Sequence, residues 1–142
     1  MKLPMAMIRA ELSKKNKYYI DKHRHYELRH FCLQYPRLKK EYDTYCDVGP
    51  NISKFEELYS DNLRTDPTFS WVVKREKTLE KIKLIERAAI ETDDILFQYI
   101  LKGVTEGLSY TYLKTILQIP CSKDMYYDLY RRFFWILDGL RG

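Results

Sequence analysis

Residues of zinc-ligating type cluster near the start of the chain, at His23, His25, His30 and Cys32. On a helix, His23 and His30 would share a face, whereas His25 would point about 160° away from them. No second ligand pair follows at the spacing of a zinc site. We therefore expect solvated and packing histidines here, and no metal site.

Carboxylate and serine side chains occur, but in none of the patterns that catalysis needs. Glu56-Glu57 and Asp93-Asp94 accompany no His, Cys or glycine-rich loop in a mechanistic arrangement. Ser109 and Ser122 precede helical patterns and are typical of helix N-caps. The chain lacks the motifs GxSxG, GxxxxGKS/T and GxGxxG. We expect neither an enzyme activity nor a cofactor.

Composition predicts an all-α protein of ordinary domain size. The 142 residues are 45% hydrophobic and 15% aromatic, with only five Gly and five Pro for turns. Three cysteines, an odd number without CxxC spacing, predict reduced thiols and a cytoplasmic location. The start lacks a secretory leader, and no apolar run reaches the roughly 18 residues of a membrane span.

Positive charge is concentrated in the first third of the chain. Residues 1–45 carry 11 basic and 5 acidic side chains, whereas residues 91–142 carry 6 and 7. A basic segment of this kind is typical of a nucleic-acid contact or of a solvated helix surface.

Breaks in the helical pattern divide the chain into three segments. Residues 1–46 form a basic N-terminal helical segment, in which Pro36 separates a helix over 18–35 from a shorter one to about Tyr45. Residues 47–66 are a linker that begins with Asp-Val-Gly-Pro-Asn and contains a helical turn at 55–59. Residues 67–142 contain the longest helix and the C-terminal elements.

The longest predicted helix runs from Thr68 to about Glu91. Its core-facing stripe consists of Val72, Leu79, Ile82, Ile85 and Ala89. Thr92-Asp93-Asp94 predicts a cap for a further helix, from Ile95 to Lys102, which Gly103 would end.

The last part of the sequence predicts a short helix, a tight turn and a longer helix. Ser109 would cap the helix over 110–117, and Ser122 the helix from Lys123 to about Leu140. This order is typical of a helix-turn-helix, although a plain helical hairpin has the same pattern. The expected core stripe of the last helix is Tyr126, Leu129, Phe133, Ile136 and Leu140. The expected outward positions are Lys123, Asp124, Tyr127, Asp128 and Arg131.

Four stretches of the sequence resemble the RinA/ArpU-type activators of phage late-gene transcription. They are Glu27-Leu28 through Tyr35-Pro36-Arg37-Leu38-Lys39-Lys40, then Asp66-Pro67-Thr68, then Leu84-Ile85-Glu86-Arg87-Ala88, then Ile119 to Tyr127. Two positions depart from the family pattern: Met125 replaces a usual Thr, and Asp128 a common Arg or Lys.

The resemblance implies a prophage-encoded regulator with a helix-turn-helix similar to region four of bacterial sigma factors. Its partners would be double-stranded DNA and host RNA polymerase. The DNA-binding residues would be Ser109, Lys114, Ser122, Lys123, Tyr127 and Arg131. A supporting basic patch would consist of Lys14, Lys15, Lys17, Arg37, Lys39 and Lys40.

Three other functions stay open at this point. The aromatic residues between Tyr126 and Trp135 go round the last helix, which favours a protein-binding modulator of a host machine or self-association. A small terminase-like DNA-packaging subunit would also use a helix-turn-helix and oligomerise. The same rings could serve as a stacking platform for single-stranded nucleic acid.

Overall fold

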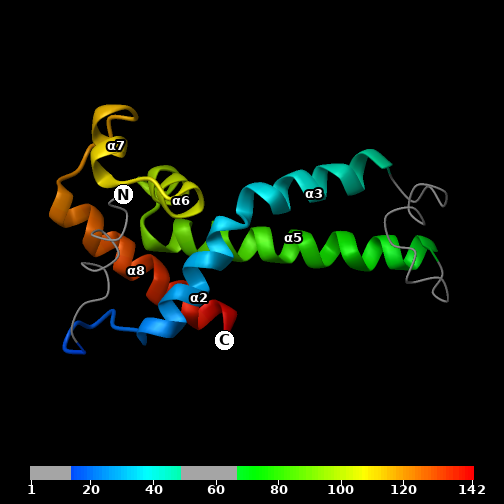
Figure 1. Ribbon diagram of the computed structural model, residues 1–142, viewed down its shortest axis with the longest axis horizontal. Helices are drawn as coiled ribbons and strands as arrows, with labels where there is room; N and C mark the ends of the chain where they lie inside the picture. Colours follow the sequence, from blue (N-terminus) through cyan, green and yellow to red (C-terminus); the bar gives the residue numbers. More distant parts are fainter. Residues whose placement is uncertain (1–13, 49–66) are drawn as a thin grey trace. The chain divides into compact units, whose positions relative to one another are not determined.

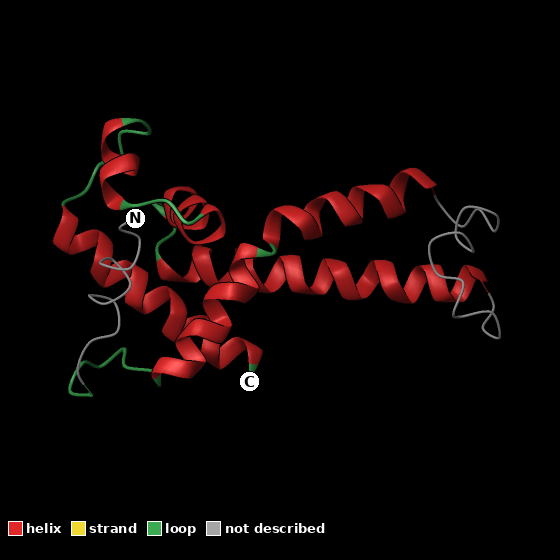
Figure 2. Cartoon of the chain, viewed as in Figure 1, coloured by secondary structure: helices red, strands yellow, loops and turns green. Residues whose placement is uncertain are grey.

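A computed structural model describes residues 14–48 and 67–142 of the chain, and all regular structure in these residues is α-helical (Figures 1 and 2). The expectation of an all-α protein is confirmed. The predicted turn at 55–59 and most of the predicted linker lie outside the described residues. None of the described helices is long and apolar enough to cross a membrane.

Six helices make up the described chain, and their bounds are α2 (Lys22–Leu33), α3 (Tyr35–Val48), α5 (Pro67–Thr92), α6 (Phe97–Glu106), α7 (Tyr110–Thr115) and α8 (Lys123–Arg141). They form two compact units. The α8 unit contains the described residues up to Tyr35 together with Leu84–Gly142, and the α3–α5 unit falls within Pro36–Lys83. This grouping differs from the predicted segments, because α5 contributes to both units.

The α8 unit is built around the aromatic side of α8. Its largest fully buried side chains include Tyr126, Phe133 and Phe134 of α8, together with Leu28 of α2 and Ile100 of α6. Phe133 and Phe134 pack edge to face with ring centroids 4.9 Å apart. Burial of such rings is the main stabilising contribution to a core of this size.

All five residues of the stripe predicted for the last helix belong to the core or pack against it, but they are not equally buried. Tyr126, Leu129 and Phe133 are buried, whereas Ile136 and Leu140 are half-buried and Leu137 is fully enclosed instead. The rings of α8 also do not go round its surface. Tyr126, Tyr127, Tyr130, Phe133 and Phe134 are all buried, and Trp135 is the large aromatic side chain of α8 that stays exposed.

The junction between α5 and α6 is fixed by Asp93, within the predicted cap Thr92-Asp93-Asp94, and α6 begins at Phe97 instead of the predicted Ile95. Thr92 is still helical, and its hydroxyl donates to the Ala88 carbonyl (2.7 Å). Asp93 is the residue that accepts backbone hydrogen bonds, from the N–H groups of Ile95 (2.9 Å) and Leu96 (2.8 Å). The carboxylate therefore fixes the turn that precedes α6.

The prediction that Gly103 ends this helix is wrong. Gly103 lies inside α6 and is buried, and α6 ends at Gly107, which adopts the left-handed conformation (φ 67°). A Cβ atom at Gly103 would collide with the hydroxyl of Tyr126. Glycine is needed at 103 because α8 approaches α6 closely there, and at 107 because of the backbone conformation.

The N-terminal helix is shorter than predicted. It begins at Lys22, where Asp21 accepts a hydrogen bond from the His23 N–H (3.0 Å), and it ends before Pro36 as expected. Before it, the side chain of Asn16 accepts from the Tyr18 N–H (2.8 Å), which fixes a turn. This turn places Tyr18 next to α8.

The α3–α5 unit is an antiparallel helix pair (Figure 1). The indole N–H of Trp71 donates to the Tyr45 carbonyl (3.0 Å), and the Thr78 hydroxyl donates to Glu41 (3.2 Å). Leu38 of α3 and Ile82 of α5 are also buried. Of the predicted long-helix stripe, Ile82, Ile85 and Ala89 are buried, and Val72 and Leu79 are half-buried.

Candidate nucleic-acid interface

The segment Ser109–Arg131, here the α7–α8 segment, contains most of the predicted site residues. Ser109 caps α7, because its hydroxyl oxygen accepts a hydrogen bond from the Tyr112 N–H (3.2 Å). Ser122 caps α8 in the same way through the Met125 N–H (3.2 Å). Both predicted caps are confirmed, and both serines are exposed.

The turn between α7 and α8 is fixed by hydrogen bonds at both of its ends. The Ile119 N–H donates to the Leu113 carbonyl (3.0 Å), and the side chains of both residues are fully buried. The Tyr110 hydroxyl donates to the Cys121 carbonyl (2.6 Å), so the start of α7 lies beside the start of α8. Gln118 is left-handed (φ 59°), and no other described non-glycine residue has a positive φ.

The predicted contact residues of this segment differ in how exposed they are. Ser109, Lys114, Ser122 and Lys123 are exposed, and Lys114 Nζ lies 3.5 Å from the Ile119 carbonyl oxygen. Asp124, Met125 and Asp128 are exposed as well. The first two turns of α8 therefore present one cation, two carboxylates and a thioether to solvent.

The expectation that Tyr127 faces outward is wrong. Tyr127 is 7% exposed, and its ring packs against the rings of Tyr126 (5.2 Å) and Tyr130 (6.1 Å). The Arg131 side chain is 15% exposed and lies 3.9 Å from Asp128. Little of either side chain is available to a partner.

The predicted basic patch is split between the two units. Lys14, Lys15 and Lys17 belong to the α8 unit and are exposed. The other three residues, Arg37, Lys39 and Lys40, belong to α3 in the α3–α5 unit, where Arg37 pairs with Glu41 (3.4 Å).

A contact that the sequence did not indicate joins the segment before α2 to α8. The rings of Tyr18 and Trp135 lie 5.6 Å apart, and Arg132 Nη1 donates to the Tyr18 hydroxyl (3.4 Å). Lys17 Nζ lies 5.0 Å from the centroid of the Tyr18 ring. Lys17 is thereby held next to α8.

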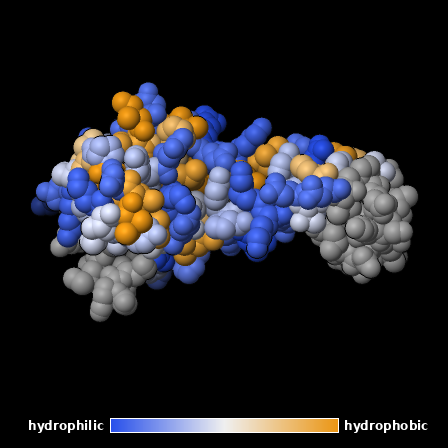
Figure 3. Space-filling model, turned by 90° about the horizontal axis from the view of Figure 1, so that it is seen from above, coloured by the Kyte–Doolittle hydropathy of each residue, from blue (hydrophilic) through white to orange (hydrophobic). Residues whose placement is uncertain are grey.

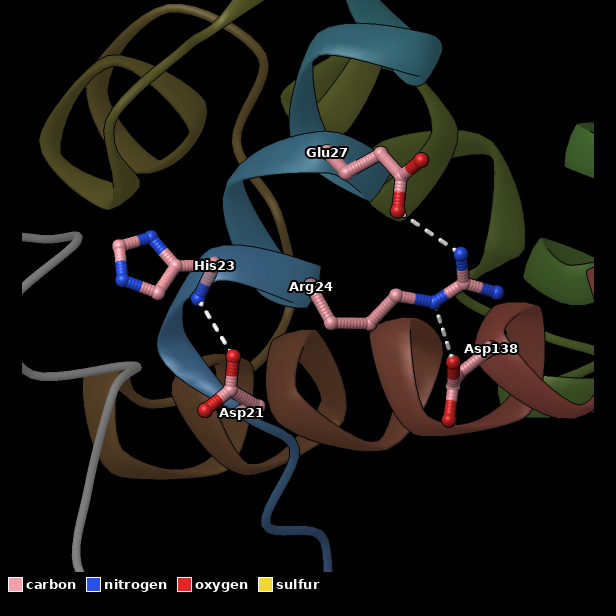
Figure 4. Close-up of polar contacts among 5 residues, drawn as sticks. All are labelled: Asp21, His23, Arg24, Glu27 and Asp138. Carbon is pink, nitrogen blue, oxygen red and sulfur yellow. Dashed lines mark hydrogen bonds and ion pairs between the residues drawn. The ribbon is translucent and has the colours of Figure 1, made fainter.

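A partly buried ion pair joins α2 to α8 (Figure 4). Arg24 Nε donates to Asp138 of α8 (2.6 Å), and Arg24 Nη1 donates to Glu27 of α2 (2.9 Å). The hydrogen bond to Asp138 is the main reason that the pKa of Arg24 is raised, so the guanidinium stays charged. The pair neutralises Asp138, the side-chain carboxylate of α8 nearest its C-terminal end.

The histidine and cysteine residues near the start do not converge on a metal position. His25 and Cys32 are buried in α2, whereas His23 and His30 are exposed. No group of three or more His, Cys, Asp or Glu side chains in residues 14–48 and 67–142 is arranged to hold a metal ion.

Hydrophobic side chains also reach the surface, where Figure 3 shows them as patches among hydrophilic residues on one face of the molecule. Tyr112, Ile116 and Met125 are the large apolar residues of the α7–α8 segment that are exposed, by 44%, 59% and 46%. The segment therefore presents mixed chemistry, with hydroxyl, ammonium, carboxylate and apolar groups.

Comparison of the chain with models of protein families, with curated proteins and with solved structures gives no match.

Proposed function

We propose that this protein binds double-stranded DNA through the α7–α8 segment, used as a helix-turn-helix, and regulates transcription. The observation that carries the proposal is the construction of this segment. A short capped helix is joined by a rigid turn to a longer capped helix, whose first turn is exposed. Helix-turn-helix proteins place the first turns of their second helix in the major groove.

The exposed groups of the segment suit such a contact. The hydroxyls of Ser109 and Ser122, at the starts of α7 and α8, would donate to phosphate oxygens. Lys123 would pair with phosphate or guanine, and Asp124 and Asp128 would accept from the amino group of cytosine. Since Tyr127 and Arg131 are largely covered, these two residues would support the segment rather than read bases.

The resemblance to RinA/ArpU-type activators adds the biological setting to the proposal. It implies a phage or prophage regulator of late genes, which acts with the RNA polymerase of the bacterial host. The sequence features that carry it, from Glu27 to Tyr127, are those given above.

A protein-binding modulator is the second candidate, and one observation favours it. Tyr112, Ile116 and Met125 expose apolar surface on α7 and on the first turn of α8. Apolar and aromatic groups of this kind occur at protein interfaces. The buried rings of α8 no longer favour this function, since they belong to the core.

Binding of duplexes selected from a random pool tests the proposal. Fluorescence anisotropy should show sequence-dependent binding to the selected duplex, and Lys123→Ala should weaken it by about 1–3 kcal/mol if Lys123 contacts a base. Arg87→Ala is the matched control, because Arg87 is an exposed cation of α5 paired with Glu91. Absence of any sequence preference at low salt would reject the DNA-binding function.

The second candidate is tested by capture of a protein partner on the immobilised protein. If Ile116→Ser does not affect this capture, the protein-binding function is rejected.

A further inference from the structure

The surface around Trp135 combines exposed aromatic area with unpaired positive charge. We define it by Tyr18 and its three contacts, Lys17, Arg132 and Trp135, and by Lys14, an exposed cation three residues before Lys17. Trp135 is 48% exposed although it packs against Tyr18 (5.6 Å). An exposed ring that is held in place by a neighbour presents a rigid apolar surface to a ligand.

The positive charge of the Trp135 surface is not neutralised by any ion pair among the described residues. In the part of the chain that the structure describes, no carboxylate forms an ion pair with Lys14, Lys17 or Arg132. Among residues 14–48 and 67–142, the carboxylates nearest in the chain have other partners: Asp138 binds Arg24 (2.6 Å), Asp128 faces Arg131 (3.9 Å), and Asp21 caps α2. A polyanion could therefore meet three cations on this surface.

Trp135 also lies on the same face of α8 as the exposed start of the helix. On an α-helix, residues 124, 128 and 135 fall on one face, since 100° per residue places them within about 40° of one another. Trp135 lies eleven residues beyond Asp124, or about 16 Å along the axis at 1.5 Å per residue. The major groove is about 12 Å wide. If the start of α8 lies in the groove, a surface about 16 Å further along the same helix face lies beyond the width of the groove and within reach of the bordering phosphate backbone.

We propose that the Trp135 surface is a backbone clamp for duplex DNA. Lys14, Lys17 and Arg132 contact successive phosphates, and the exposed edge of Trp135 packs on deoxyribose. The inference rests on the function proposed above. In it, the Trp135 surface contributes to the affinity for DNA but not to the sequence preference. Phosphate contacts position a protein on DNA, whereas contacts to base edges determine the sequence preference.

The salt dependence of binding distinguishes the clamp from a base-reading surface. The double variant Lys14→Gln/Lys17→Gln should flatten the slope of log K against log salt concentration by about two units, since each phosphate contact contributes about 0.9. The loss should be the same on the selected and on unrelated duplexes. Trp135→Ala should weaken binding with little change in slope. Arg87→Gln, an exposed cation paired with Glu91 on α5, is the control and should leave the slope unchanged.

A second measurement reports the contact directly. The chain has two tryptophans, so in a Trp71→Phe background the emission comes from Trp135 alone. Duplex DNA should quench or shift this emission with the same midpoint as the anisotropy.

The outcomes separate the clamp from the function on which it rests. An unchanged slope in the double variant, with Lys123→Ala still weakening specific binding, overturns the clamp and leaves the function standing. If the emission of Trp135 responds to single-stranded DNA but not to duplex DNA, the clamp is also overturned. If the wild-type protein binds no duplex even at a low salt concentration of about 50 mM, both the clamp and the proposed function are overturned.

Discussion

At the scale of single residues, the two serines of the α7–α8 segment each have a role that the sequence defines locally. A hydroxyl that accepts from the backbone N–H three residues later needs no partner from elsewhere in the fold. For this reason both caps could be predicted from the sequence. The DNA contacts proposed for the same hydroxyls use lone pairs and protons that capping leaves available.

The three cysteines differ in their surroundings, and the difference predicts their reactivity. Cys46 is exposed, Cys121 is half-buried with its pKa raised by burial, and Cys32 is fully buried with its pKa raised far above the ordinary value. The thiolate is the reactive form, so a raised pKa lowers the reactive fraction at pH 8. We expect Ellman titration of the native protein to show one fast thiol, one slow thiol and one that reacts only after unfolding.

The control for this titration is Cys46→Ser, which should abolish the fast phase alone. Two fast thiols in the native protein, or modification of Cys32 before unfolding, would contradict the burial seen in the structure.

At the scale of elements, the packing of α8 on α6 depends on the absence of a side chain at Gly103. A Cβ atom there would meet the hydroxyl of Tyr126, which is itself 1% exposed. Gly103→Ala should therefore destabilise the fold by about 1–3 kcal/mol, as overpacking does in other cores. Urea unfolding followed by circular dichroism measures the change in the free energy of unfolding.

Gly139→Ala is the matched control for Gly103→Ala. Gly139 is an exposed residue of α8, and a Cβ atom there would have no neighbour within 4 Å. Because alanine favours a helix interior over glycine, this variant should gain about 0.5–1 kcal/mol. Equal effects of the two substitutions would show that helix propensity, and not the contact with Tyr126, governs position 103.

These two glycines also show why parts of the fold could not be predicted from the sequence. A glycine near the end of an apolar pattern usually ends a helix, and that local rule placed the end of α6 at Gly103 instead of Gly107. The true reason for Gly103 is a contact with Tyr126, a residue 23 positions away. A contact of this kind is visible only after both helices are placed.

The candidate site could likewise be predicted only in part from the sequence. Helical spacing identified the start of α8, but the rotation of α8 about its axis depends on the neighbours that bury its rings. Tyr127 was expected outside and is buried, because α8 packs on α2 and α6 over a broad aromatic face. The contacts of Tyr18 with Trp135 and Arg132 join residues about 115 positions apart, so no sequence spacing indicated them.

At the scale of the whole molecule, the α8 unit contains charged residues from two distant parts of the chain. The exposed start of α8 carries Lys123 together with Asp124 and Asp128, which by themselves repel a polyanion. Lys14, Lys15 and Lys17 come from the other end of the chain and belong to the same unit. Under the proposed function, α8 would supply the sequence selectivity of the unit, and a segment about one hundred residues earlier would supply the affinity.

The buried phenols of the same unit predict how the fold responds to high pH. Burial raises the pKa of Tyr126 and of Tyr130 above the ordinary value, and it raises that of Cys32 as well. In the unfolded chain these groups lose their protons near pH 10 for tyrosine and near 8.5 for cysteine, as model compounds do. The native state then binds more protons than the unfolded state, so stability is fully present below these values and is lost as the pH rises. Each buried phenol should lower the free energy of unfolding by about 1.4 kcal/mol per pH unit above pH 10.

Tyr126→Phe tests this expectation and also reports on the Tyr126 hydroxyl. That hydroxyl is buried and has no hydrogen-bond partner among the described residues, so its removal at pH 7 should leave the stability unchanged or raise it by up to about 1–3 kcal/mol. Above pH 10 the variant should lose stability less steeply than the wild type, by about 1.4 kcal/mol per pH unit. Urea unfolding at pH 7, 9, 10 and 11, with the exposed Tyr112→Phe as control, provides both numbers. A marked loss of stability at pH 7 would show that the hydroxyl has a partner, and parallel curves at high pH would show that Tyr126 ionises within the native core.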